Sequence, residues 1–192
     1  MKKKILILSG TRAEYGYIKR ILKLMERSTK LEYCLLVSGT HLDKEFGASI
    51  KEIKEDKIEK FIQVRINAIP KDPFEWSKNI GKSINKLSNT IKKIEPDLIL
   101  IPGDPWIIFA TAIASTYMRI PIAHIQGGEL SGNVDGIVRH AITKLAHIHF
   151  VSNKNAKKVV KQLGEEEFRI FNVGGSMMDE VIYGEKIDKH IL

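Results

Sequence analysis

Short, continuous apolar runs alternate along the chain with segments whose apolar residues recur every three or four positions. An unbroken apolar run of four to six residues is typical of a strand buried on both faces of a parallel sheet. The pattern predicts strands at residues 5–9, 33–38, 61–66, 98–102, 121–125, 147–151 and 169–173.

The intervening segments have helical periodicity. It is clearest at residues 80–94, where the apolar positions step by four, three, four and three and Pro96 ends the pattern. We interpret residues 10–16 as a turn that precedes a helix containing residues 18–25, and Pro70 and Pro73 as marking a loop. Further helices are predicted at residues 48–55, 105–118, from about 136, 156–163 and 177–182.

Strands that alternate with helices indicate an α/β fold. We predict a Rossmann-like, doubly wound parallel sheet of about seven strands, with helices on both faces and the strand at residues 5–9 at its centre. The 192 residues suit one domain, which we place at residues 1–183. Residues 184–192 are interpreted as a stub that leads to a second domain absent from this sequence.

Composition excludes several classes of protein. Hydrophobic residues make up 43% of the chain and charged residues 28%, which is unlike a disordered tail, a collagen-like fibre or a polar linker. No apolar stretch approaches the roughly 20 residues of a membrane-spanning helix, and the run behind the initial lysines is too short for an export signal. We therefore expect a cytoplasmic protein that does not associate with membranes.

The net charge of +8 is compatible with binding nucleic acid, an acidic membrane surface or a phosphorylated small molecule. Much of the excess comes from Lys82, Lys86, Lys92 and Lys93, which lie opposite the apolar stripe of one predicted helix. We interpret them as a solvated face, because no aromatic residues are interleaved there to stack on bases. No nucleic-acid partner is expected.

Metal and cofactor signals are weak. The single cysteine, Cys34, excludes an internal disulfide and is interpreted as a small buried hydrophobe. His147 and His149 share one side of a strand but lack a third ligand at suitable spacing, so we predict no metal site. Neither the six-residue dinucleotide glycine motif nor a P-loop lysine motif is present, and no cofactor is expected.

Glycines and polar residues follow nearly every predicted strand. They lie at residues 9–16, 38–41, 103–105, 126–129 and 174–176. Ligands of open α/β sheets bind at the carboxyl ends of the strands, where glycine lets the backbone approach and helix N-termini favour anions. This clustering predicts a nucleotide or sugar site.

Several of these residues allow two interpretations. Arg12 favours a functional role, since capping a helix does not need a guanidinium. Asp104 precedes Pro105 and either caps the next helix or contacts a ligand, and Asp135 either caps the helix from about residue 136 or takes part in chemistry. We place Arg139 and His140 in the first turn of that helix, where two cationic donors oppose the helix dipole and favour an anionic ligand.

Four sequence segments carry a family resemblance. SGTRAEYG at 9–16, SGTHL at 38–42, AHIQGGE at 123–129 and RHAITKLAH at 139–147 together resemble the hydrolysing UDP-N-acetylglucosamine 2-epimerases. The branch in question makes N-acetylmannosamine for sialic acid and related nonulosonic acids. The resemblance implies two Rossmann-like domains that face each other across a cleft, as in GT-B glycosyltransferases. This chain resembles the first of them.

The resemblance also implies roles for individual residues. Arg12 matches the arginine of the first loop at the phosphate and sugar cleft, Asp104 matches the aspartate after the fourth strand, and Asp135 matches a carboxylate that acts in acid–base chemistry at C2. Gln126 occupies the position where several members have a partner glutamate, and an amide cannot exchange a proton near neutral pH. Glu129 and Asp104 are then the nearest candidates for a second carboxylate.

Other positions depart from the family. Its common Gly-Asp-Arg-x-Glu segment reads Gly-Asp-Pro-Trp-Ile here, so Pro105 and Ile107 replace the arginine and the glutamate. We expect substrate binding by five residues: Arg12, His41, Gln126, Arg139 and His140. The rim at the carboxyl ends of the strands, which carries Arg12, His41, Asp104, Gln126 and Asp135, is expected to be an open face.

We therefore predict the first half of a hydrolysing UDP-N-acetylglucosamine 2-epimerase, which acts with a complementing C-terminal domain or as a homo-oligomer. Alone, the chain is expected to bind UDP-N-acetylglucosamine weakly and to show no measurable turnover. The alternatives are half of a GT-B glycosyltransferase, an epimerase for a related nucleotide sugar, a non-catalytic module that binds a nucleotide sugar or a partner chain, and a basic nucleic-acid binder.

Overall fold

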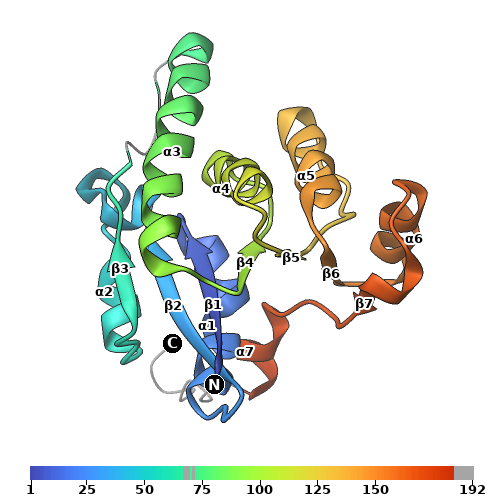
Figure 1. The fold of residues 1–192 in the computed structure, drawn as a ribbon, viewed down its shortest axis with the longest axis horizontal. Helices are drawn as coiled ribbons and strands as arrows, with labels where there is room; N and C mark the ends of the chain where they lie inside the picture. The colour runs from blue at the N-terminus through green and yellow to red at the C-terminus, as the bar shows by residue number, and fades with distance from the viewer. Residues whose placement is uncertain (67–69, 71, 184–192) are drawn as a thin grey trace, which may run out of the picture.

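The computed structural model describes residues 1–66, 70 and 72–183. Its described strands form one seven-stranded sheet in the order β3-β2-β1-β4-β5-β6-β7, and every neighbouring pair is parallel (Figure 1). The strands are β1 (Lys3–Ser9), β2 (Leu31–Val37), β3 (Phe61–Gln63), β4 (Leu98–Pro102), β5 (Ile122–Ile125), β6 (Ile148–Val151) and β7 (Ile170–Asn172). The α/β class and the seven parallel strands are confirmed.

The place of the first strand needs a small correction. β1 is an interior strand between β2 and β4, but β4 holds the middle position of the seven. The chain reverses its direction of winding between β1 and β4, and this reversal is the switch point at which open α/β sheets bind ligands. The predicted stub at 184–192 lies outside the described residues.

The helices cover the two faces unequally. In Figure 1, α3, α4, α5 and α6 stand in a row on one face, and α1 lies on the other. The α-helices are α1 (Arg12–Glu26), α2 (Ile50–Glu55), α3 (Pro73–Ile94), α4 (Trp106–Tyr117), α5 (Asn133–Leu145), α6 (Lys154–Gln162) and α7 (Met178–Tyr183). Short 3₁₀ turns occur at η1 (Gly39–Leu42), η2 (Lys44–Phe46) and η3 (Glu167–Arg169).

The alternation of side chains along the strands produces two hydrophobic cores. Leu6 and Leu8 of β1 pack with α3 and α4, whereas Ile5 and Ile7 pack with α1 on the opposite face. Successive strand residues point to opposite faces, so a run that is apolar at every position supplies both cores at once. This explains why the strands read as continuous apolar runs.

Several predicted boundaries were wrong, and local capping explains two of them. α1 begins at Arg12, because Thr11 and Glu14 form a capping box, so residues 12–16 are helical and not a turn. α3 begins at Pro73, because the Asp72 side chain accepts a hydrogen bond from the Glu75 amide and proline fits the first helical turn. β3 is also shorter than predicted, and ends at Gln63.

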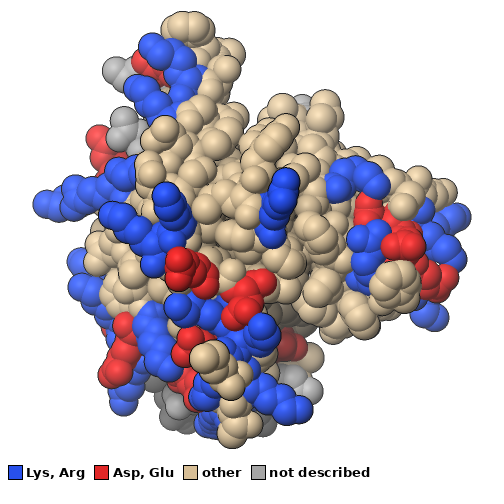
Figure 2. Space-filling model, in the orientation of Figure 1, with Lys and Arg blue, Asp and Glu red and all other residues tan. Residues whose placement is uncertain are grey.

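Lys and Arg side chains do not gather in one stripe on the face shown in Figure 2, where they are mixed with acidic and uncharged residues. Among the described residues, no helix combines the length and apolar character that crossing a bilayer requires.

Candidate functional site

The loop after β1 is folded by a buried carboxyl group. The Glu14 side chain is 2% exposed, and its Oε2 accepts hydrogen bonds from the amides of Gly10 and Thr11, the latter at 3.0 Å. Burial raises the pKa of Glu14 to about 8, although the two amide hydrogen bonds oppose the rise. Its Oε1 is buried without a hydrogen-bond partner among the described residues.

His41 lies beneath the same loop. Its Nε2 is 2.8 Å from Ser9 Oγ and its Nδ1 is 2.7 Å from Ser49 Oγ, and the residue is fully buried. Burial lowers the pKa of His41 to about 4, so the ring is neutral near pH 7. The expectation that His41 belongs to the open rim is therefore wrong. We name Ser9, Glu14, His41 and Ser49 the first-loop cluster.

Arg12 is the exposed part of this loop. Its side chain is 77% exposed, and its Nε lies 2.9 Å from Glu52 Oε1 of α2. The backbone at Gly39 packs directly against this loop. Gly39 has a φ of +58°, and a Cβ there would lie 2.6 Å from the Gly10 carbonyl oxygen. Arg12 can therefore turn toward a ligand while the backbone under it stays fixed.

A second group of charged residues gathers after β4. Arg139 Nη2 of α5 lies 2.5 Å from Asp104 Oδ2, and the two side chains are 14% and 17% exposed. Burial raises the pKa of Asp104 above its ordinary value, Arg139 opposes this rise, and the negative charge of Asp135 adds to it. We name Asp104, Asp135 and Arg139 the charged cluster.

The capping interpretation fails for both aspartates. The N-cap residue of α4 is Pro105, and Asp104 pairs with Arg139 across the site. The N-cap residue of α5 is Gly132, so Asp135 is the third residue of the helix and is exposed. Neither aspartate is therefore an N-cap residue, and Asp104 is instead paired with Arg139.

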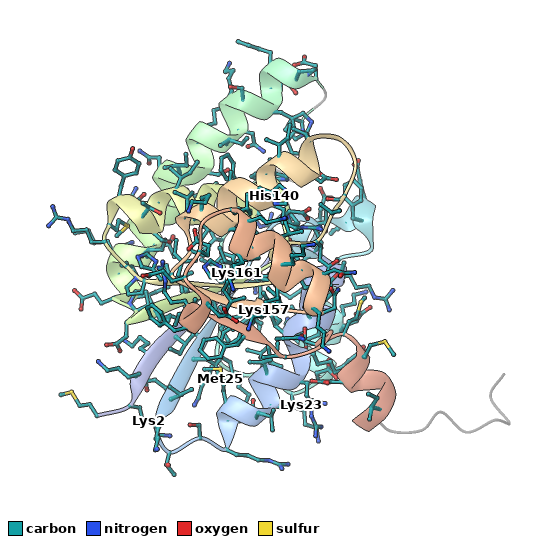
Figure 3. The ribbon with its side chains drawn as sticks, turned by 90° about the vertical axis from the view of Figure 1, so that its right-hand side faces the viewer. Lys2, Lys23, Met25, His140, Lys157 and Lys161 are labelled. Atoms are coloured by element: carbon teal, nitrogen blue, oxygen red, sulfur yellow. The ribbon has the colours of Figure 1, made fainter. Side chains whose placement is uncertain are left out.

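Arg139 and His140 lie in the middle of α5 and not in its first turn, because the helix begins at Asn133. The argument from the helix dipole therefore does not apply to them. Arg139 Nε and His140 Nδ1 are buried without a hydrogen-bond partner among the described residues. In the view of Figure 3, α6 with Lys157 and Lys161 lies in front of α5 with His140.

Gln126 and Glu129 have different surroundings. Gln126 follows β5 with a φ of +64°, and its backbone N–H donates to the Phe150 carbonyl oxygen at 2.9 Å. The Glu129 carboxylate accepts hydrogen bonds from Ser152 Oγ and from Asn153 Nδ2, the latter at 3.2 Å. Glu129 thus ties its own loop to the start of α6, whereas Asp104 faces Arg139.

The two departures from the family segment contribute no charge. Pro105 is the N-cap residue of α4, and Ile107 is 1% exposed and packs against the first loop, where a Cβ on Gly10 would lie 2.7 Å from Ile107 Cγ2. The isoleucine fills the space beside Gly10 and Glu14.

Sequence reasoning missed two buried polar residues, Glu14 and His124. Glu14 was recognisable, since the spacing Thr11-x-x-Glu14 is that of a capping box. His124 is fully buried in β5, with Nε2 at 2.8 Å from the Gly103 carbonyl oxygen. Its only sequence signal is that it interrupts an apolar run.

No group of three or more His, Cys, Asp or Glu residues suited to a metal ion occurs in the described part of the chain. His147 precedes β6 and is exposed, whereas His149 is buried and lies 3.1 Å from Glu165. The two histidines therefore have separate surroundings.

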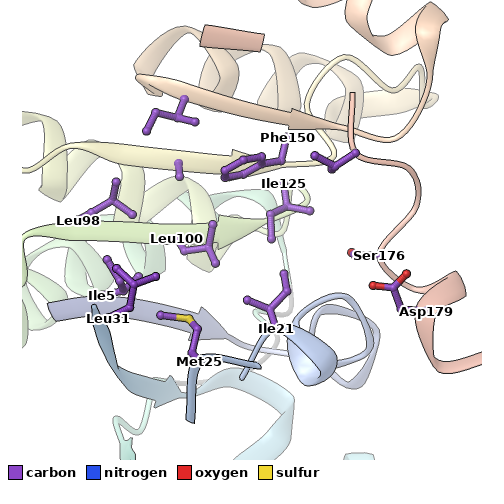
Figure 4. A pocket seen from close by; sticks show the side chains of 13 residues that line it. Ile5, Ile21, Met25, Leu31, Leu98, Leu100, Ile125, Phe150, Ser176 and Asp179 are labelled. Carbon is purple, nitrogen blue, oxygen red and sulfur yellow. The ribbon is translucent and has the colours of Figure 1, made fainter. Parts of the chain in front are cut away.

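A cavity of about 440 Å³ lies away from these residues (Figure 4). It is on the α1 side of the sheet, between α1 and strands β4 to β6, and its walls include Leu100, Ile125, Phe150 and Met25. Ser176 and Asp179 are the polar residues at its edge. Because its lining is almost wholly apolar, it does not suit a sugar diphosphate.

Comparisons with known proteins identify the family of this chain. The family model described as UDP-N-acetylglucosamine 2-epimerase matches residues 23–192. The UDP-N,N'-diacetylbacillosamine 2-epimerase (hydrolyzing) of Legionella pneumophila is 36% identical over 182 residues, which are 95% of this chain and 48% of the relative. The GDP/UDP-N,N'-diacetylbacillosamine 2-epimerase (hydrolyzing) of Campylobacter jejuni is 37% identical over 90% of this chain and 45% of its own.

The fold is also found in a solved structure. The crystal structure of UDP-GlcNAc 2-epimerase from Neisseria meningitidis bound to UDP-GlcNAc superposes with a TM-score of 0.80 at 18% identity, over 93% of this chain and 48% of that one. The chain thus spans about half the length of the relatives that it matches. On the strength of the family match, the chain belongs to the UDP-N-acetylglucosamine 2-epimerase family.

Proposed function

We propose that this chain supplies one half of the active site of a hydrolysing nucleotide-sugar 2-epimerase. The reaction converts UDP-N-acetylglucosamine and water to N-acetylmannosamine and UDP, for sialic or related nonulosonic acid synthesis. The observation that carries the proposal is the charged cluster, in which Asp104 pairs with Arg139 and lies within electrostatic influence of Asp135.

The first half-reaction needs a base and stabilisation of a leaving diphosphate. A carboxylate removes the proton from C2, the electron pair forms the C1–C2 double bond, and the bond from C1 to the UDP oxygen breaks. We assign the base to Asp135, which is exposed and has no capping duty. Arg12 and Arg139 are the cationic groups at this edge of the sheet for the departing phosphates, with His140 beside Arg139.

The second half-reaction adds water to the glycal. The proton that Asp135 took from C2 passes to the solvent. The water oxygen bonds to C1, and the proton that the water loses goes to the same acid that delivers a proton to C2 from the opposite face of the sugar. Gln126 cannot supply that proton, and Glu129 is engaged by Ser152 and Asn153. We therefore assign the second acid–base role to Asp104. Asp104 is not the N-cap residue of α4 and is paired with Arg139 instead.

The relatives leave two sugars to be compared. The Legionella and Campylobacter relatives are named for diacetylbacillosamine, whereas a Neisseria meningitidis relative of 36% identity is named UDP-N-acetylglucosamine 2-epimerase. Both nucleotide sugars carry an N-acetyl group at C2 and a UDP leaving group at C1, so the same C2 chemistry serves either. An assay with both substrates identifies the preferred one.

The test uses three preparations: the complete gene product that carries this chain, the 192-residue chain alone, and a fusion of residues 1–183 to the C-terminal half of the Legionella relative. UDP release and the free 2-epimeric sugar are measured together by NMR. We expect turnover in a preparation that has two domains, and weak binding without turnover in the chain alone. Binding of UDP without sugar release in every preparation would instead support a non-catalytic module.

A further inference from the structure

Two histidines lie side by side in the sheet and have different partners. His124 of β5 and His149 of β6 are paired in register, and both are fully buried. His149 bonds to Glu165, which lies in the connection that enters β7. His124 bonds to the Gly103 carbonyl oxygen, at the opposite, carboxyl end of the strands. The pair therefore offers a comparison between a purely structural histidine and one beside the site.

The contacts of His124 fix its tautomer. A carbonyl oxygen only accepts, so Nε2 carries the hydrogen that bonds to Gly103 at 2.8 Å. Nδ1 is then an acceptor and lies 3.3 Å from Thr143 Oγ1 of α5. Burial lowers the pKa of His124 to about 4, so the ring keeps this neutral form near pH 7.

These contacts form a ring that includes Asp104 and Arg139 of the charged cluster. Gly103 precedes Asp104 with a φ of +68°, and Asp104 pairs with Arg139. Thr143 Oγ1, one helical turn after Arg139, lies 2.9 Å from the Arg139 carbonyl oxygen and 3.3 Å from His124 Nδ1, and its single hydroxyl hydrogen is shared between these two acceptors. The ring thus connects the end of β4, the interior of β5 and the middle of α5.

The backbone after β5 lies close to the contact between His124 and Thr143. A Cβ on Gly127 would lie 2.9 Å from Thr143 Oγ1 and 3.0 Å from His124 Nδ1. A side chain at position 127 would therefore displace Thr143 or His124, which favours glycine there.

We propose that His124, with Thr143, is a positioning residue that fixes the Gly103–Asp104 turn against α5, so that Asp104 and Arg139 face the substrate in a single geometry. The catalytic consequence rests on the proposed epimerase function. The effect on Asp104 and Arg139 themselves does not.

The experiment compares His124→Leu with His149→Leu in the complete gene product. Each change removes a fully buried imidazole and the hydrogen bond it makes, but only the first breaks the ring. We expect kcat to fall by about 10²-fold for His124→Leu, since a misplacement of 1 Å can cost that much. His124→Gln keeps an N–H donor for Gly103 and should recover part of the loss. His149→Leu should lower stability without a comparable loss of kcat.

A second measurement does not depend on turnover. Carbon-13 NMR follows the titration of the Asp104 carboxyl in the same variants. Since Arg139 lowers the pKa of Asp104, loosening their pairing should move that titration to higher pH in His124→Leu and in Thr143→Val, but not in His149→Leu. Thr143→Val also carries the test if His124→Leu does not fold.

Two results would overturn the inference: an Asp104 titration that is unchanged in both ring variants, or equal losses of kcat for His124→Leu and His149→Leu. If the unmodified protein shows no epimerase activity, the proposed function fails, and the titration of Asp104 still decides whether His124 positions it.

Discussion

The two halves of the carboxyl edge use similar residues in opposite ways. In the first-loop cluster, after β1 and β2, a glutamate and a histidine are sealed in the interior and bond to backbone amides and serine hydroxyls. In the charged cluster, after β4 and β5, two aspartates and an arginine stay partly or wholly exposed. The difference shows that a polar residue at the end of a strand either builds the loop or faces the ligand.

Burial decides which of these roles a residue takes. A carboxyl group without a cationic partner becomes neutral when it is buried, as the raised pKa of Glu14 shows. Asp104 is also partly buried, but Arg139 compensates its charge. The carboxylates that a ligand can reach are therefore those of the charged cluster, to which we assign the acid–base roles of the proposed function, whereas the first-loop cluster lies under the loop that carries Arg12.

The comparison is tested most strongly by Asp135→Asn in the complete gene product. Loss of a general acid or base costs about 10²–10⁴ in rate, so we expect kcat to fall by that factor. Because Gly132 and not Asp135 is the N-cap residue, the free energy of unfolding should hardly change. The matched control is Asp72→Asn, which makes the same change at the N-cap residue of α3, outside the charged cluster, and should leave turnover intact. Unchanged turnover in Asp135→Asn would remove Asp135 from the mechanism.

Glu14→Gln tests whether the first-loop cluster is neutral. The folded protein keeps a proton on Glu14 up to about pH 8, whereas the unfolded chain releases it near pH 4.5, so this residue costs stability as the pH rises between those values. The glutamine variant lacks this cost and should be more stable than the parent by about 3 kcal/mol at pH 7, but by much less at pH 5.

Urea unfolding at the two pH values provides the measurement for Glu14. A stability difference that does not depend on pH would show that Glu14 is ionised in the folded state, and would contradict the contrast between the two clusters.

His41 should give the opposite pH dependence. Its folded pKa of about 4 is below that of the unfolded chain, so the unfolded state binds more protons between about pH 6.5 and 4. Stability from this residue is therefore complete above pH 6.5 and is lost as the pH falls to 4, by about 3 kcal/mol in total. In His41→Asn the unfolding free energy should depend less on pH in that range, and an unaltered slope would count against a buried neutral His41.

Arg12→Ala should have the smallest effect on stability. The Arg12 side chain is exposed and its partner Glu52 is partly exposed, and exposed ion pairs contribute about 0–1 kcal/mol to stability. If Arg12 contacts the substrate phosphates, KM for the nucleotide sugar should rise although the free energy of unfolding hardly changes. Glu52→Ala is the control, since it removes the same pair but leaves the guanidinium; an equal rise in KM for both variants would assign Arg12 to loop structure only.

The sequence alone was sufficient for the fold. Strands and helices are predicted from the spacing of apolar residues over short stretches of sequence. Their alternation is enough to predict a doubly wound parallel sheet and the edge at which it binds ligands. The helix starts at Arg12 and Pro73 were interpreted as a turn and a loop. The local sequence does carry their capping signals, Thr11-x-x-Glu14 and Asp72-Pro73. The candidate residues Arg12, Asp104 and Asp135 were also chosen from local position and resemblance.

Only the tertiary structure decided what each candidate does. Asp104 and Arg139 are 35 residues apart in the chain, and the path of α5 across the sheet brings them together. His41 is sealed because η1 folds back over β1, and Glu129 is engaged because the start of α6 lies beside it. His124 has a role because the register of β5 places it beside Gly103, under Thr143. Burial and pairing between distant segments set these charges and contacts, and no local pattern of residues encodes such distances.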